Sequence, residues 1–180
     1  MIWDIPALLN TAGFTQNQLY ENNVAGHFNY RWEDIAAALG MGNLPAESYY
    51  LGRFLIFDDQ GDKQKLIELI TMEAHSLAET NDWQLENVSL EQLALLACEE
   101  LKVMSVCGYC NGLGFNRTGE DCNPCLGYGW KGYTEKEKYQ FIGVNGKSWY
   151  RRWQLRYTDI LNYLGGAAYH LREHLEQQLC

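Results

Sequence analysis

An eight-residue pattern, Cys-x-x-Cys-x-Gly-x-Gly, occurs twice in this chain of 180 residues, first from Cys107 and again from Cys122. Two residues between paired cysteines allow a tight turn that aims both thiolates at one ion. The glycines that follow suit a positive-φ backbone that bends amides toward the sulfurs. Two such knuckles supply four ligands for one tetrahedral zinc ion: Cys107, Cys110, Cys122 and Cys125.

Four cysteine ligands leave no coordination position for water or substrate, so the pattern predicts one structural Zn²⁺ rather than a catalytic one. The alternatives are an oxidoreductase dithiol and buried free thiols, and both fit the matched pair of knuckles less well. Two further cysteines lie outside the pattern. We expect Cys98 to be a core thiol and Cys180 to be an exposed thiol in the tail.

The remaining sequence predicts a mainly α protein with the zinc finger as a small insertion. A content of 24 aromatic residues and three prolines excludes a disordered chain. Helices are expected at 32–39, at 62–79 with Asp62 as the cap, and from the cap Ser89 to about residue 104. The stretch 47–57 fits either a buried helix or a short strand.

This pattern divides the chain into four parts. Residues 1–30 form a segment of unknown structure, 31–105 a helical body, 106–131 the zinc finger, and 132–180 a helix-turn-helix region with a C-terminal helix. We find no stretch of about 18 apolar residues that would cross a membrane and no signal peptide. A cytosolic protein without a membrane partner is expected.

Charge is distributed unevenly along the chain. The net charge of −9 argues against a nucleic-acid partner, because DNA-binding proteins usually carry a basic excess. Residues 1–97, however, hold 4 basic and 14 acidic residues, whereas 131–164 hold 7 basic and 3 acidic residues. One basic segment on an acidic protein indicates two surfaces with different partners.

The basic segment has the layout of a helix-turn-helix. Thr134 and Glu137 form a capping box, Gly143 can end the first helix, and a second helix is expected over about 147–164. One face of that second helix is apolar and predicted to be core; it carries Trp149, Trp153, Tyr157, Ile160 and Leu164. The other face and its edges carry the candidate DNA-binding residues: Lys147, Ser148, Tyr150, Arg151, Arg152, Gln154 and Arg156.

Two alternatives apply to the charged residues of the C-terminal region. The arginines of the second helix can instead pair with the acidic half of the same chain. His170 and His174 stand four residues apart, a spacing that suits a metal site, but solvated helix histidines are the expected reading.

Several motifs in this order resemble the late-gene antitermination protein Q of lambda-type phages. The likeness covers roughly residues 33–175 and includes Glu33-Asp-Ile-Ala-Ala-Ala-Leu-Gly-Met41, Gly61-Asp-Lys-Gln-Lys65, the two cysteine knuckles and Lys147-Ser-Trp-Tyr-Arg-Arg-Trp153. The resemblance implies a factor that binds a double-stranded DNA element at a late promoter and engages bacterial RNA polymerase at its flap, together with the σ factor. Such a factor makes the enzyme read through pauses and terminators. It would act in the host cytoplasm at the nucleoid.

Two other classes remain open. The cysteine octet is also the unit of the zinc domain in DnaJ-like co-chaperones, which would make the chain a polypeptide-binding module. That domain has four octets for two zinc ions, whereas this chain has two octets and no His-Pro-Asp motif. An enzyme is not expected, because the chain has no open metal site, Ser-His-Asp order, P-loop or dinucleotide loop.

Overall fold

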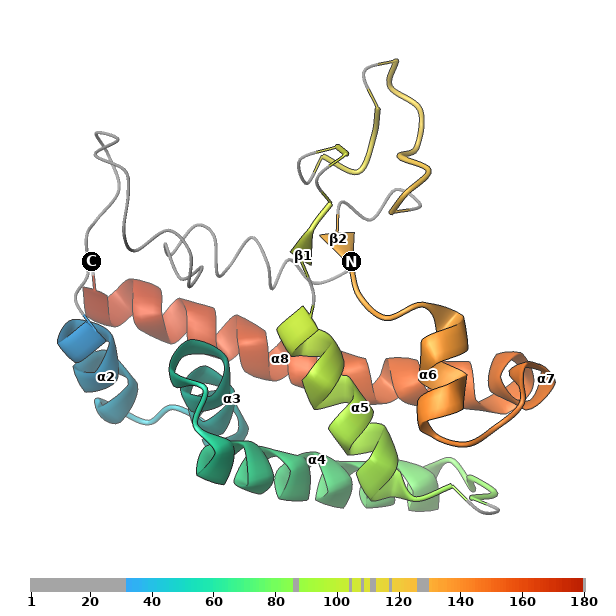
Figure 1. Cartoon of the computed structure of the whole chain (residues 1–180). Helices are drawn as coiled ribbons and strands as arrows, with labels where there is room; N and C mark the ends of the chain where they lie inside the picture. The colour runs from blue at the N-terminus through green and yellow to red at the C-terminus, as the bar shows by residue number, and fades with distance from the viewer. Residues whose placement is uncertain are drawn as a thin grey trace.

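The structure is a computed structural model, and it describes residues 32–85, 88–103, 105–107, 109–110, 113–116, 118–125 and 130–179. The segment 1–30, Cys180 and three of the four knuckle glycines lie outside the described residues. The predicted mainly α fold is confirmed (Figure 1). In chain order the elements are α2 (Trp32–Gly40), α3 (Ala46–Phe57), α4 (Gln60–Thr80), α5 (Leu90–Val103), β1 (Ser105–Val106), β2 (Trp130–Lys131), α6 (Glu135–Phe141), α7 (Gly146–Ser148), the π-helical turn η1 (Trp149–Trp153) and α8 (Gln154–Leu179).

The ambiguous stretch 47–57 is helix α3, and tertiary packing explains why. Its buried residues include Leu51 and Phe54, which join the main core. Gly52 brings the α3 backbone close to two neighbouring helices, since a Cβ there would lie 2.9 Å from a methyl carbon of Leu39 and 3.0 Å from one of Leu171. Packing against Leu39 and Leu171 therefore explains why this stretch is a helix rather than a strand.

Helix α4 begins two residues earlier than the sequence indicates, and its cap is a different aspartate. The side chain of Asp59 accepts hydrogen bonds from the backbone N–H groups of Gly61 and Asp62. Asp62, the predicted cap, instead lies in the first turn and is nearly buried, where it pairs with Arg53 at 3.0 Å and with Lys65 at 3.0 Å. The prediction of Asp62 as the cap is wrong because Asp59 takes that position; Arg53 pairs with both aspartates, at 2.8 Å to Asp59 and 3.0 Å to Asp62.

The predicted start of α5 and both predicted ends of α6 are confirmed. Helix α5 begins directly after Ser89. Helix α6 begins after Thr134, whose side chain accepts a hydrogen bond from the backbone N–H of Glu137 while the Glu137 carboxylate accepts one from the Thr134 N–H. Gly143 follows α6 with φ of 73°, a backbone conformation that favours glycine. Local sequence signals are sufficient at these positions.

The expected helix at 147–164 is part of a longer one. Asn145 caps α7 through the backbone N–H of Ser148, and the helical path then continues through η1 and α8 to Leu179. Gly165 and Gly166 do not interrupt it. Gly165 is buried, so the core packs along this stretch and offsets the low helix propensity of glycine.

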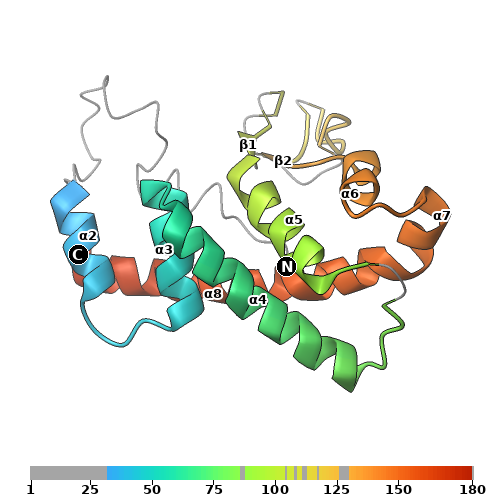
Figure 2. The ribbon, with the colours of Figure 1, turned by 60° about the horizontal axis from the view of Figure 1, so that its bottom comes forward.

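Helix α8 packs against both halves of the helical body. Its C-terminal half lies beside α2 and α3, and its N-terminal half lies beside α5 (Figure 2). One main core joins the side chains of α3, α4 and α5 to Trp149, Trp153 and Tyr157. The predicted boundary at residue 132 therefore does not separate two cores.

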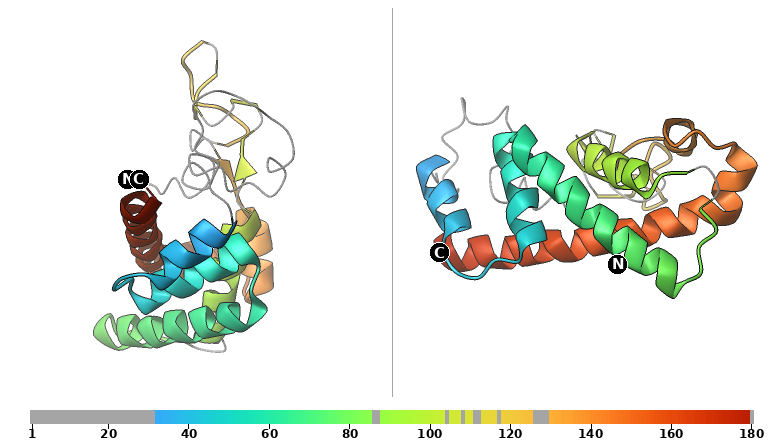
Figure 3. Two further views of the ribbon diagram at one scale, coloured as in Figure 1. Left: turned by 90° about the vertical axis from the view of Figure 1, so that its left-hand side faces the viewer. Right: turned by 90° about the horizontal axis from the view of Figure 1, so that it is seen from below.

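The finger leaves the helical body between two short paired strands. Ser105 pairs with Lys131 and Val106 with Trp130 in antiparallel register, which brings the end of α5 next to the segment that leads into α6. The described finger residues project away from the helices (Figure 3, left). In the part of the chain that the structure describes, no helix has the length and hydropathy needed to span a bilayer.

Candidate metal centre and basic helix face

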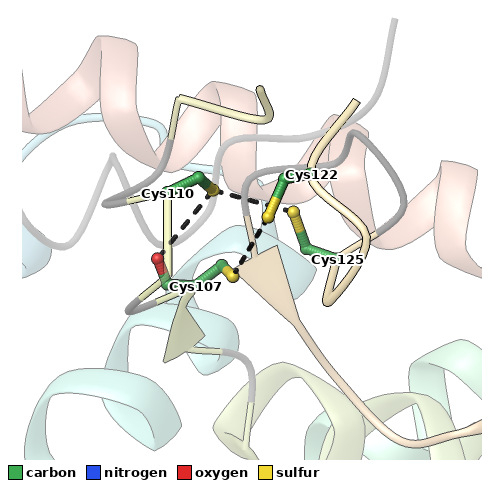
Figure 4. Close-up of side chains that lie close together, drawn as sticks. All are labelled: Cys107, Cys110, Cys122 and Cys125. Atoms are coloured by element: carbon green, nitrogen blue, oxygen red, sulfur yellow. Dashed lines mark hydrogen bonds between the residues drawn. The ribbon is translucent and has the colours of Figure 1, made fainter. Parts of the chain in front are cut away.

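The four knuckle cysteines converge on one point, as the sequence predicts (Figure 4). All four are buried, and their sulfur atoms lie within 4.8 Å of one another. The Sγ atoms of Cys107 and Cys122 are 3.9 Å apart, and those of Cys110 and Cys125 are 3.7 Å apart. A tetrahedral ion with bonds of about 2.3 Å requires sulfur pairs about 3.8 Å apart. The sulfurs therefore fit a single tetrahedral metal ion.

Backbone groups around the first knuckle prepare it for a metal. The N–H of Gly114 donates to the Cys110 sulfur at 3.4 Å, and Gly114 itself has φ of 77°. The backbone N–H of Cys110, assisted by that of Tyr109, lowers the pKa of the Cys107 thiol to about 7. A thiolate is the form that binds a metal, so these N–H groups favour the ligand state.

The finger loop between the knuckles is held by its own side chains. The side-chain oxygen Oδ1 of Asn116 accepts hydrogen bonds from the backbone N–H groups of Thr118 and Glu120. Phe115 pairs with Asp121 through an isolated β-bridge. These contacts keep the two knuckles close although 15 residues separate Cys107 from Cys122. Among the described residues, Cys98 lies apart from this cluster, buried in the helical core as predicted.

The structure places most of the candidate DNA-binding residues on an exposed face of α7, η1 and the start of α8. Lys147, Tyr150, Arg151 and Arg152 are exposed, whereas Ser148 and Gln154 are half-buried. The Arg152 guanidinium contacts the Ser148 hydroxyl at 3.4 Å. Within the described residues, Lys147 and Arg151 have no hydrogen-bond or ion-pair partner.

The predicted core face of this helix is confirmed, and η1 explains how it is built. Trp149 and Trp153 are fully buried, and Tyr157 is nearly so. The indole N–H of Trp149 donates to the Glu135 carboxylate of α6. This bond joins the first helix of the basic segment to the second and turns the basic side outward.

Arg156 stands apart from the other candidates. Its guanidinium donates to the backbone oxygen of Gln84 at 2.8 Å and lies 4.6 Å from the Trp153 ring and 5.5 Å from the Trp83 ring. Such stacking on aromatic faces stabilises the contact. Arg156 thus contacts the segment before α5, and sequence spacing alone gave no sign of this role.

The arginines of this helix differ in their contacts with the acidic half of the chain. Arg156 contacts that half through the backbone oxygen of Gln84, whereas Arg151 has no carboxylate partner among the described residues. The two histidines are also placed: His170 is exposed as expected, whereas His174 is half-buried with its ring nitrogen 2.8 Å from the Ala38 oxygen.

A buried polar group that the sequence analysis missed links the finger to the basic helices. The Glu100 carboxylate on α5 accepts hydrogen bonds from the Tyr157 hydroxyl on α8 and from Lys138 on α6, the latter at 3.0 Å. Gly132, just after β2, lies against the same carboxylate so closely that a Cβ would collide with it. The only sequence signal was that Glu100, beside Glu99, falls at helical spacing from the apolar Leu93, Leu96 and Ala97.

Comparison of the chain with protein-family models, with curated proteins and with solved structures gives no match. Three features of the molecule bear on its function: the four-cysteine cluster, the basic helix face and the contacts of Glu100.

Proposed function

We propose that this protein is a zinc-containing, DNA-tethered transcription antitermination factor of the lambda phage Q type. In this proposal it binds a double-stranded DNA element at a late promoter through the helix that begins at α7. It then engages paused bacterial RNA polymerase and the σ factor and makes the enzyme read through pauses and terminators. The observation that carries the proposal is that Lys147 and Arg151 are exposed and have no hydrogen-bond or ion-pair partner among the described residues.

The arrangement of α6, the turn and the following helix supports a DNA-binding role. The turn 142–145 joins α6 to α7, and the second helix packs its tryptophans inward while its basic side faces solvent. Lysine and serine suit phosphate oxygens, and the planar fork of arginine can contact two acceptors of guanine. Lys147 and Arg151 are available for such contacts, whereas Arg152 contacts Ser148 and Arg156 contacts Gln84.

The charge distribution favours a factor that needs a second contact. Residues 1–97 carry 14 acidic against 4 basic residues, so this part repels DNA and leaves only a small basic face to bind it. Binding through a few phosphate contacts is weak and falls with rising salt. A simultaneous contact with polymerase raises the effective concentration of the face at the promoter.

Zinc has a structural role in this proposal. The cluster would hold one Zn²⁺ through four thiolates, which supplies cross-linking between the two knuckles rather than a reactive water. The metal would therefore fix the finger between α5 and α6. Glu100 contacts Tyr157, Lys138 and Gly132 together, so the segment that follows the finger meets the DNA-facing helices at this carboxylate.

Transcription with purified bacterial RNA polymerase on late-promoter templates tests the proposal. We expect terminator readthrough to rise when the protein is added, and to be lost when Arg151 and Arg152 are both replaced by alanine. Arg172→Ala is the matched control, because Arg172 is an exposed arginine near the other end of α8 that pairs with Glu176 on the same helix. Full readthrough with the double variant, or no effect of the wild-type protein on any template, would contradict the proposal.

A further inference from the structure

The most exposed of the large hydrophobic side chains in the described part of the chain is Leu155, which is 71 % exposed. Met72 is comparably exposed at 67 %, but it lies on α4, in the acidic half of the chain. Leu155 is instead the second residue of α8, in the first turn after η1. A single exposed leucine is common on protein surfaces. Whether Leu155 belongs to a binding surface therefore depends on the residues around it.

Leu155 lies at the C-terminal end of the basic face. Arg151 precedes it by four residues across the end of η1, and Asp159 lies one α-helical turn after it. Tyr150, 58 % exposed, belongs to the preceding turn. An apolar side chain is thus surrounded by cations and an aromatic ring toward the helix N-terminus, and the acidic Asp159 marks where the basic surface ends.

We propose that Leu155 reads the 5-methyl group of a thymine in the major groove of DNA. This inference rests on the proposed DNA binding by the same helix, and it adds which base the site selects. A recognition helix places its N-terminal residues at base edges while neighbouring cations bind phosphates. In the major groove, the thymine methyl group is the apolar mark that distinguishes T·A from the other pairs.

The charge pattern favours DNA over a protein partner as the occupant of this face. A protein that bound an exposed leucine between Lys147, Arg151 and Arg152 would need an acidic surface with an apolar pocket in it. DNA supplies both features, since its phosphates match the cations and a methyl group lies between the phosphate rows. The absence of hydrogen-bond and ion-pair partners for Lys147 and Arg151 among the described residues leaves those charges available for phosphates.

Selection from a random duplex library, followed by methyl deletion, tests this inference. The full-length wild-type protein first selects its preferred duplex. Each thymine of that duplex is then replaced in turn by deoxyuridine, which removes only the methyl group. We expect one replacement to weaken wild-type binding about fourfold, the scale set by burial of one methyl-sized group. Leu155→Ala should bind that deoxyuridine duplex and the thymine duplex equally well.

Met72→Ala is the control for loss of an exposed hydrophobic side chain away from the basic face, and it should retain the full thymine preference. If Leu155→Ala keeps the same sensitivity to deoxyuridine, or if no thymine methyl matters to the wild-type protein, the assignment to Leu155 is wrong while DNA binding stands. If the wild-type protein selects no duplex and causes no terminator readthrough, the proposed function fails, and this inference with it.

Discussion

The Tyr157 hydroxyl on α8 donates a hydrogen bond to the Glu100 carboxylate on α5, and both side chains are buried. Burial, together with the adjacent carboxylate, raises the pKa of Tyr157 well above its usual value, so the phenol remains a donor. Lys138 on α6 donates to the same carboxylate at 3.0 Å, and its ammonium lies 5.4 Å from the Tyr157 ring. Three helices thus meet at one buried charge.

Removal of the Tyr157 hydroxyl tests the importance of this contact. Tyr157→Phe keeps the ring in the core but leaves the carboxylate without one of its donors. We expect the free energy of unfolding to fall by about 1–3 kcal/mol, the cost of an unsatisfied buried polar group. Urea denaturation followed by circular dichroism measures this change. Tyr169→Phe, at an exposed tyrosine of the same helix, should change stability by less than about 0.5 kcal/mol.

The close approach of Gly132 to Glu100 predicts that a methyl group there is not tolerated. In Gly132→Ala the new Cβ would collide with the carboxylate, which can move away only by weakening its bonds to Tyr157 and Lys138. We expect a lower melting temperature and weaker DNA binding. Gly166→Ala is the matched control, because a Cβ at that helical position meets nothing within 4 Å. It should stabilise the protein by up to about 1 kcal/mol; equal melting temperatures for the two variants would contradict this picture.

The four-cysteine cluster predicts one zinc ion per chain. We expect elemental analysis and native mass spectrometry to find one Zn²⁺ in the purified protein and none in Cys110→Ser. Hydrogen exchange should then show lost protection around residues 106–130, while the main core keeps its protection because it does not include the cluster. Cys98→Ala should retain the metal. A protein that folds fully, finger included, without metal would overturn the assignment.

Burial of Cys98 predicts a slow reaction with alkylating reagents. Burial raises the pKa of its thiol to about 12, against an ordinary value of 9.0. The raised pKa means that folding favours the neutral thiol, so this contribution to stability is complete below pH 9 and is lost as the pH rises toward 12. At pH 8 the folded protein should leave the Cys98 peptide unmodified by iodoacetamide, as followed by mass spectrometry. Unfolding in urea should make the same peptide react readily; rapid modification of the folded protein would show that Cys98 is not in the core.

Much of this protein could be predicted from local spacing. The four metal ligands, the capping box of Thr134 and Glu137, and the buried tryptophans Trp149 and Trp153 all follow patterns that span a few residues. A C-x-x-C turn or a helical repeat is determined by bond geometry within one segment. Such features are therefore readable without knowledge of any distant neighbour.

The tertiary structure decided the features that depend on distant neighbours. It made 46–57 a helix through close packing at Gly52, placed Arg53 between the cap Asp59 and the nearly buried Asp62, and brought Arg156 to Gln84. The Glu100 carboxylate joins α5 to α6 and α8 only because the fold brings these helices together beside Gly132. The sequence determines which side chains have the chemistry to bind a metal or a phosphate. Burial and long-range contacts determine which of these side chains remain accessible to a ligand, because a group such as Arg156 is already engaged within the protein.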